Sequence, residues 1–282
     1  ATPLVIDPTP GTGTTNVAVQ NNLKTIPVLS GSEVQTMTLV GAGQTTLSYN
    51  GAPALLGPLT VTNEIQRLTA LTTGSTTLSF NGISATSALN FTNEQQRINF
   101  VAAGTTTFSY NAANATPFNF TAASTAAQIQ ANLRTITALN AANAAVTVVD
   151  NTGSPTGSVA PFTVTFNGNL AGQNASQLGS SNPQAATTSL IVDGSSPSPG
   201  ALQTNLNTIS ALAGNVSVAA GPTANTYNIT FINALAGQDV SQLVSSASGV
   251  ASMTTPTNGN APTAAQILAN LQSIPALSGA TA

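Results

Sequence analysis

Three glutamates are the most regular chemically active feature of this sequence. Glu33, Glu64 and Glu94 each open one of three similar segments, and they are spaced 31 and 30 residues apart. Carboxylates at equivalent positions of stacked repeats could act as a ladder of cation ligands. Calcium takes about six to eight oxygen ligands, however, and no D-x-[DN]-x-[DN]-G pattern accompanies the glutamates. The sequence therefore argues against a metal site at these three glutamates.

Two arginines supply the opposite charge. Arg67 and Arg97 follow Glu64 and Glu94 by three residues, and residues three apart in a strand face opposite sides. A glutamate would then meet an arginine of a neighbouring repeat or copy. We predict that these charges set the register of stacking, with solvated strand ends as the alternative, and we assign this assembly role to one set of residues: Glu33, Glu64, Glu94, Arg67 and Arg97.

The remaining side chains offer little catalytic chemistry. The 282 residues include no cysteine, histidine or tryptophan, which removes disulfides, thiolate and imidazole ligands and the commonest general base. Serine and threonine are abundant but lack a base to activate them. The aspartates are scattered and are typical of turns and caps: Asp7, Asp150, Asp193 and Asp239. We predict that the protein is not an enzyme and has no catalytic, cofactor-binding or metal-binding residues.

Composition points to a neutral, associating surface. Hydrophobic residues make up 41% of the chain, enough for a core, but only 4% of residues are charged, against about 25% in an ordinary soluble domain. Four Lys and Arg and a net charge of −3 offer no basic patch for nucleic acid. No apolar run reaches the roughly 18 residues of a membrane span. A surface of hydroxyls and amides favours association between copies.

The segments that the glutamates open predict β-hairpins. Residues 33–51, 64–82 and 94–112 align with one another. Their apolar residues alternate with polar ones, as in a half-buried strand: Leu47 and Tyr49, Leu78 and Phe80, Phe108 and Tyr110. A glycine near each middle, at Gly43, Gly74 and Gly104, is expected to supply the turn.

A second unit occurs four times and predicts short amphipathic helices. The copies begin at Thr15, Thr125, Ser198 and Thr263, and each carries apolar residues at a shared spacing of 4, 3 and 3, a helical stripe. Serine or threonine stands at each N-cap. We predict helices near 16–26, 125–136, 199–211 and 263–274, with one core leucine in each: Leu23, Leu133, Leu206 and Leu271.

A third unit occurs twice, at 162–178 and 227–243, and predicts a strand followed by an "LAGQ" turn that Leu178 or Leu243 packs. The order helix, strand, strand, turn recurs from 125 to 178 and from 198 to 243, which indicates a tandem array. The predicted fold is mainly β with short helices, a β-rich α+β class of repeat modules, each packed by a short amphipathic helix. The predicted segments are a junction with a strand and helix at 1–31, three hairpin repeats at 32–112, helix-strand-strand repeats at 113–183 and 184–248, and a second junction at 249–282.

As a set, these elements resemble the tandem repeats of very large secreted surface proteins of environmental bacteria and of some phage virion proteins. The resemblance rests on "EVQ", "TLSFNG", "TAAQIQANL", "NVSV", "FTVTF" and "LAGQ" in that order. It implies a β-rich modular structural or surface role and transfers no catalytic residues.

The two ends of the chain show the same phase of the pattern. "LKTIPVLSG" begins at Leu23 and "LQSIPALSG" at Leu271, 248 residues later, and "LVID" near the start matches "LIVD" before the third helix. We predict head-to-tail contacts that extend as a filament, with a donor strand that pairs at a sheet edge: Leu4, Val5, Ile6 and Asp7. The partner is a copy of the chain, or the next unit is a covalent continuation.

These observations favour a structural subunit or repeat segment of an extracellular filament, sheath or surface layer at the cell surface. The alternative is an adhesin stalk or a phage virion fibre or tail module that binds a surface glycan. A binding module should display exposed aromatics or a charged pocket, and the chain has only nine Phe and three Tyr. The sequence therefore favours the structural role, with glycans as candidate partners of the alternative.

Overall fold

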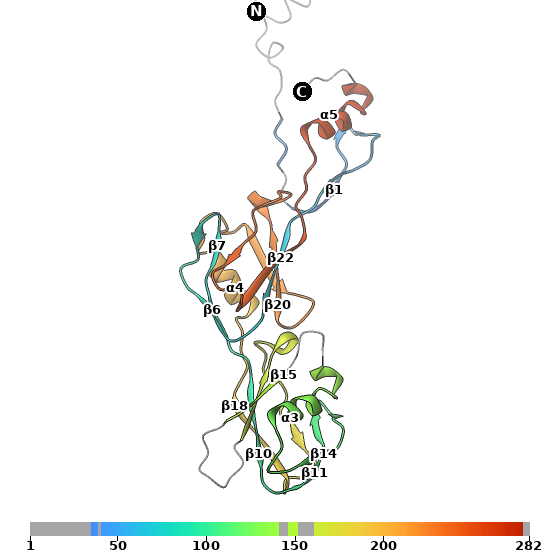
Figure 1. Cartoon of the computed structure of the whole chain (residues 1–282). Helices are drawn as coiled ribbons and strands as arrows, with labels where there is room; N and C mark the ends of the chain where they lie inside the picture. The colour runs from blue at the N-terminus through green and yellow to red at the C-terminus, as the bar shows by residue number, and fades with distance from the viewer. Residues whose placement is uncertain (1–34, 39–40, 141–145, 152–160, 279–282) are drawn as a thin grey trace, which may run out of the picture. The chain divides into compact units, whose positions relative to one another are not determined.

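The computed structural model describes residues 35–38, 41–140, 146–151 and 161–278. The chain divides into two units, Ala1–Thr38 and Leu39–Ala282, and the described helices and strands belong to the second (Figure 1). Four predicted features lie outside the described residues: the donor strand Leu4–Asp7, the helix near 16–26, its core residue Leu23 and the first glutamate, Glu33.

The described fold is mainly β, as predicted, and it contains a module that appears twice in full. The inner module takes residues 94–120 and 125–192. Its main antiparallel sheet has the order β15-β16-β10-β18, beside the small sheets β11-β14 and β13-β12-β17. Its elements are β10 (Gln95–Phe100), β11 (Gly104–Thr106), β12 (Phe108–Tyr110), β13 (Ala113–Asn114), β14 (Phe118–Phe120), α3 (Ala126–Leu133), β15 (Val146–Asp150), β16 (Phe162–Phe166), β17 (Gly179–Ser180) and β18 (Ala186–Val192).

The middle module repeats this arrangement with residues 64–91 and 198–257. Its main sheet has the order β19-β20-β5-β22, and its small sheets are β21-β7-β8 and β6-β9. Its elements are β5 (Ile65–Ala70), β6 (Gly74–Thr76), β7 (Leu78–Phe80), β8 (Ile83–Ser84), β9 (Leu89–Phe91), α4 (Pro199–Leu206), β19 (Val216–Ala220), β20 (Thr226–Phe231), β21 (Val244–Ser245) and β22 (Ala251–Thr257).

The outer module, residues 43–61 and 263–277, has the two small sheets and the helix but no four-stranded sheet among the described residues. Its strands pair as β1-β4 and β2-β3. Its elements are β1 (Gly43–Thr45), β2 (Ser48–Tyr49), β3 (Ala52–Pro53), β4 (Leu59–Val61) and α5 (Ala264–Gln272). In Figure 1, α3 lies with β10, β11, β14, β15 and β18, α4 with β6, β7, β20 and β22, and α5 with β1.

The modules are nested rather than arranged one after another, which corrects the tandem order expected from the sequence. The first hairpin segment packs with the last described helix, the second with α4 and the third with α3. Antiparallel bridges explain this order, because they hold the outgoing and returning segments side by side. Thr62 pairs with Asn260, and Thr92 pairs with Ser195.

Two of these modules have separate hydrophobic cores. The middle core combines Leu78 and Phe80 of the hairpin segment with Leu206 of α4 and Phe231 of β20. The inner core combines the equivalent residues, Phe108 and Tyr110 with Leu133 and Phe166. Each core therefore joins residues that lie far apart in the sequence. The reason is that the apolar face of the hairpin segment is buried only when a helix from a later part of the chain packs against it.

The turns of the hairpins differ from the prediction. Gly74 and Gly104 do not close a hairpin between the glutamate strand and the next strand, because β5 and β10 pair with distant strands instead. The tight turn follows β7, where Asn81 and Gly82 have φ of 50° and 81°. Positive φ at both central residues is the geometry of a type I′ turn, which Asn-Gly favours. The triplet Phe80-Asn81-Gly82 therefore marks the turn of the hairpin that β7 forms with β8.

The three described helices lie where the stripe predicts them, and they end earlier than expected. Capping explains their starts. The side-chain hydroxyls of Thr125 and Thr263 each accept a hydrogen bond from the backbone N–H three residues on. The side chains of Gln128 and Gln266 in turn accept one from the backbone N–H of that threonine, which completes the capping boxes. Ser198 caps α4, and Pro199 occupies its first position. The remaining apolar residues of each stripe continue into a 3-10 or open turn, where Ile136, Ile209 and Ile274 are still buried.

Candidate functional site

The clearest constellation of polar side chains lies around Glu94 in the inner module. Its carboxylate is buried, with 1% of the residue exposed, and it receives two donors. Ala175 donates its backbone N–H to Oε2, and Gln96 donates its side-chain amide to Oε1. Gln96 in turn accepts the backbone N–H of Leu178 at 2.7 Å and donates to the carbonyl of Ser176 at 2.9 Å. The two side chains thus hold the loop that follows "LAGQ".

Glu64 repeats this arrangement in the middle module. The residue is fully buried; Oε2 accepts the backbone N–H of Val240 at 2.6 Å, and Oε1 accepts the side-chain amide of Gln66. Gln66 accepts the N–H of Leu243 at 2.7 Å and donates to the carbonyl of Ser241. Buried polar groups are hydrogen-bonded because an unpaired one is costly. The same hydrogen bonds occur in both modules, which indicates a structural role. We call each set of contacts, in which a buried glutamate and glutamine hold the loop after "LAGQ", the lock.

An asparagine directly before each glutamate extends the lock by one contact. Asn93 Oδ1 accepts the backbone N–H of Gly172 at 3.0 Å, and Asn63 Oδ1 accepts that of Gly237 at 3.2 Å. Both glycines have positive φ, 66° and 70°, which glycine adopts without steric cost. The motif Asn-Glu-x-Gln therefore binds three backbone N–H groups of each loop in succession.

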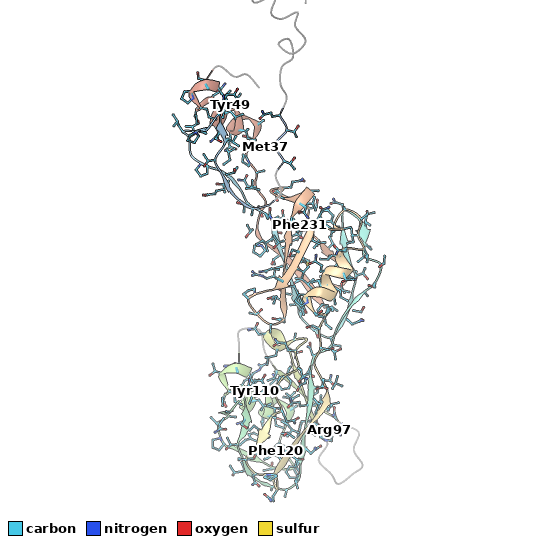
Figure 2. The ribbon with its side chains drawn as sticks, turned by 180° about the vertical axis from the view of Figure 1, so that it is seen from behind. Met37, Tyr49, Arg97, Tyr110, Phe120 and Phe231 are labelled. Atoms are coloured by element: carbon cyan, nitrogen blue, oxygen red, sulfur yellow. The ribbon has the colours of Figure 1, made fainter. Side chains whose placement is uncertain are left out.

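This geometry corrects the ion-pair interpretation of the glutamates. Within the part of the chain that the structure describes, no ion pair joins Glu64 or Glu94 to an arginine. Each carboxylate instead accepts hydrogen bonds from amide N–H groups of its own module. Arg67 donates instead to Asn228 Oδ1 at 2.9 Å. Arg97 is exposed (Figure 2). A role for Arg67 and Arg97 in assembly stays a prediction, and Glu33 lies outside the described residues.

The predicted helix-core leucines differ between modules. Leu133 and Leu206 are fully buried, whereas Leu271 is only partly buried. Leu178 and Leu243, predicted to pack the "LAGQ" turn, are each 1% exposed. The residues that the sequence assigned to the packing of the two complete modules therefore lie in their cores.

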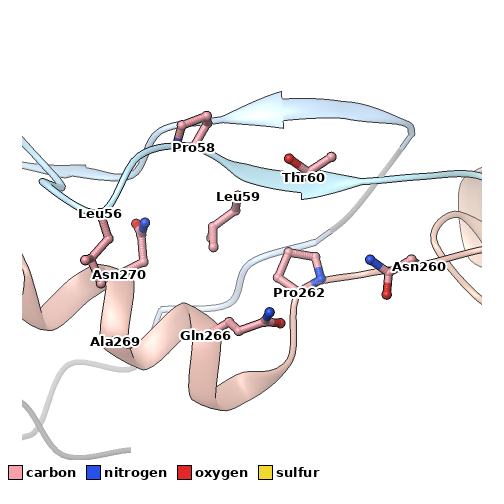
Figure 3. A pocket seen from close by; sticks show the side chains of 9 residues that line it. All are labelled: Leu56, Pro58, Leu59, Thr60, Asn260, Pro262, Gln266, Ala269 and Asn270. Carbon is pink, nitrogen blue, oxygen red and sulfur yellow. The ribbon is translucent and has the colours of Figure 1, made fainter.

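Each helix also carries a buried asparagine with an unused acceptor. Asn132, Asn205 and Asn270 donate their side-chain amides to the carbonyls of Thr116, Ser87 and Gly57. Their Oδ1 atoms have no hydrogen-bond partner. Asn270 lines a cavity of about 440 Å³ between α5 and residues 56–60, and Figure 3 shows its amide extending from the helix toward Leu56 and Pro58.

The middle module has an equivalent groove of about 480 Å³, which Asn205 lines. Neither groove has a charged or aromatic residue in its lining. Hydroxyl and amide groups alone can hydrogen-bond a neutral polar ligand, but they do not activate a nucleophile. The grooves are therefore candidates for weak binding rather than for catalysis.

Burial perturbs one titratable group. Desolvation by burial raises the pKa of Tyr110, and the negative charge of Glu94 acts in the same direction. Tyr110 is 3% exposed in the inner core, and Phe80 occupies the equivalent place in the middle core. A phenol that phenylalanine can replace is a packing residue.

Groups of three or more acidic residues that could hold a metal do not occur in the described ranges. Among the same residues, none of the helices combines the length and the apolar character that a membrane crossing needs.

Comparison with known proteins adds little. No family model matches the chain, and no curated protein matches it. One solved structure that resembles it is the flagellar cap protein FliD from Helicobacter pylori, with 9% identity and a TM-score of 0.18. The match covers 80% of this chain and 62% of that one, so the chain spans less than two thirds of the flagellar protein.

The lock was missed in the sequence although a signal for it exists. "TNE-x-Q" occurs twice, at 62–66 and 92–96, and "LAGQ-x-x-SQL" occurs twice, at 170–178 and 235–243. Because the Glu-containing motif and the "LAGQ" loop occur equally often, the sequence indicates that each copy of the motif contacts one copy of the loop. Opposite charges predict a contact between the glutamates and the arginines, whereas the donors in the structure include the backbone N–H groups of Ala175 and Val240. A backbone N–H has no signature in the sequence.

Proposed function

We propose that this chain is a structural repeat segment of an extracellular filament, sheath or surface layer. The observation that carries the proposal is the use of the buried glutamates. The residues best suited to chemistry, Glu64 and Glu94, have both carboxylate oxygens filled by donors of their own modules. Side chains that hold loops in place contribute to rigidity and leave no reactive group for a substrate.

The composition supports the same function. Because only 4% of the residues in the chain are charged, repulsion between copies is small and association is favoured. Cohesion between copies is expected from apolar burial and backbone hydrogen bonds, which salt does not screen as it does exposed ion pairs. We propose that copies of the chain, or further repeats of a longer chain, are its partners, and that it has no enzymatic activity, cofactor or nucleic-acid partner.

The test is electron microscopy and sedimentation of the native material at low salt and in molar sodium chloride. Filaments or sheets that persist at both salt concentrations are the expected result. Assemblies that dissolve in molar salt would make exposed charges the main cohesive force, and particles that stay monomeric at every concentration would contradict a structural polymer.

A second candidate function is a stalk or virion fibre that binds a neutral glycan. The two equivalent grooves favour it, because each has a buried asparagine carbonyl without a partner. A glycan array probed with the chain tests this function. Saturable binding that is lost in Asn205→Leu and Asn270→Leu would support it, and an array with no signal above background would exclude it.

A further inference from the structure

A run of exposed apolar residues lies on one edge strand of the inner module. β18 pairs with β10 on one side, and no described strand pairs with its other side. Leu190, Ile191 and Val192, at the end of β18, are 46%, 37% and 39% exposed. Among the described residues, they form the longest run of consecutive exposed large apolar side chains. Single exposed apolar residues are ordinary, whereas an apolar run on a sheet edge favours pairing with a further strand.

The equivalent edge of the middle module is polar. β22 matches β18 residue by residue from Ala251, the equivalent of Ala186. Thr255, Pro256 and Thr257 therefore take the places of the three apolar residues. Both strands have an irregular register at this point against the strand beside them, so the two edges differ in their side chains. Proline carries no backbone N–H, and on an edge strand it blocks further pairing.

A polar contact of the middle module also has no counterpart at the apolar edge. Gln242 donates its side-chain amide to Thr255 Oγ1 at 3.2 Å. The equivalent residues of the inner module are Gln177 and Leu190, and a leucine side chain cannot accept a hydrogen bond. The middle module thus binds its edge side chain with its own loop, whereas the inner module presents an exposed apolar side chain at the same position.

We propose that the β18 edge pairs antiparallel with the β18 edge of a second copy of this chain, with Ile191 opposite the partner's Ile191. Leu190 then lies opposite the partner's Val192, and Ser189 opposite the partner's Asp193. Backbone hydrogen bonds join the two main sheets into one, and the exposed apolar side chains of the two copies cover one another. Because both copies use the same strand, the contact is isologous and has two-fold symmetry.

Charge complementarity favours a second copy as the occupant. Asp193 is the one charged residue in 186–194, and in this register it faces a serine hydroxyl, which can donate a hydrogen bond to it. The two copies of Asp193 lie about 13 Å apart along the strands, at about 3.4 Å per residue. This separation exceeds the Debye length of about 8 Å at physiological salt, so no like charges meet. The β22 edge of a second copy is a poor partner because of Pro256.

Disulfide trapping tests the register, because the chain has no cysteine. Ile191→Cys places two thiols opposite each other across the two-fold axis, and oxidation should give a disulfide-linked dimer. Ser189→Cys is the matched control: it lies on the same exposed edge but about 13 Å from its counterpart, beyond the roughly 7 Å between Cα atoms that a disulfide can bridge. Its yield of dimer should be at most a tenth of that of Ile191→Cys. Equal yields would contradict the register, and no dimer from Ile191→Cys would leave the edge to a different partner.

Residues taken from the middle module test the contact without a crosslink. A triple variant with Leu190→Thr, Ile191→Pro and Val192→Thr carries in β18 the residues that β22 already accommodates. Its dimer should dissociate at a concentration at least tenfold higher in sedimentation equilibrium. Val149→Thr is the control, because Val149 is 56% exposed on β15, the opposite edge strand, and should leave dissociation unchanged. Circular dichroism confirms that both variants fold. An equal effect of both would assign association to the apolar surface in general and overturn the edge contact.

The inference rests on the proposed function, because it names one contact between associating copies, and microscopy separates the two. Filaments that form equally well from the triple variant, together with no crosslink through Ile191→Cys, would overturn the contact and leave the filament function standing. A chain that crosslinks through Ile191→Cys but never assembles beyond a dimer would support the contact and contradict the filament function. An unsubstituted chain that stays monomeric at every concentration would overturn both.

Discussion

The backbone N–H of Ala175 donates a hydrogen bond to the carboxylate of Glu94, 81 residues earlier in the chain. Val240 makes the same contact with Glu64 across 176 residues. These two contacts tie the glutamate strand of each complete module to the loop that closes it. The glutamate is therefore repeated because each module needs a buried acceptor for the loop's backbone N–H groups, which are shielded from water in the folded chain.

Replacing Glu94 tests whether the carboxylate is a lock. Glu94→Leu should destabilise the chain, because it leaves buried donors unsatisfied at about 1–3 kcal/mol each. Arg97→Leu is the control: Arg97 is exposed, and such changes are usually within about 0.5 kcal/mol. Urea unfolding of the three chains measures both effects. Equal losses in the two variants would restore the ion-pair interpretation.

The three helix leucines should differ in their contributions to stability. Leu133→Ala and Leu206→Ala each remove a fully buried side chain, at a cost of about 2–5 kcal/mol. Leu271→Ala should cost clearly less in unassembled chains, because Leu271 is partly exposed. Thermal unfolding of dilute samples gives the comparison. A Leu271→Ala loss as large as that of Leu133→Ala would mean that the outer module already has a closed core.

Nesting predicts that the middle module folds without the inner one. Thr92 and Ser195 exchange two backbone hydrogen bonds of 2.8 Å, the geometry that a two-residue hairpin closes. Replacement of residues 93–194 by Asn-Gly should therefore leave a chain that unfolds cooperatively. Calorimetry and circular dichroism check this. A non-cooperative, strand-poor product would mean that the middle core depends on the inner module.

The buried Tyr110 should lower the free energy of unfolding of the protein at alkaline pH. Its pKa is raised in the folded state by burial, so the folded chain keeps a proton that the unfolded chain releases near pH 10. The contribution is present below about pH 10 and is lost as the pH rises above that value. Tyr110→Phe should reduce this alkaline loss, and Phe80 shows that the module accepts the change. Urea unfolding at about pH 8 and pH 11 tests it; identical pH slopes in both chains would contradict the prediction.

Local features of the fold could be predicted because they depend on neighbouring residues. A stripe at a spacing of 4, 3 and 3 with Ser or Thr at the N-cap located α3, α4 and α5, since capping and amphipathicity are properties of one segment. The alternation of Leu78 and Phe80 likewise located β7. The pair Asn81-Gly82 is likewise a local turn signal, whereas Gly74 and Gly104, which lie nearer the glutamates, do not close the hairpins.

Only the tertiary structure decided which segments meet. The sequence shows repeats in a line, and nothing in α5 itself reveals that it packs with a hairpin segment more than 200 residues earlier, as the contact of Asn270 with Gly57 does. The reason is that burial is not directional: any apolar stripe fits any apolar strand face until the chain path limits the choice. The partners of Glu64 and Glu94 were hidden for a related reason, because they are backbone N–H groups, which every residue except proline carries.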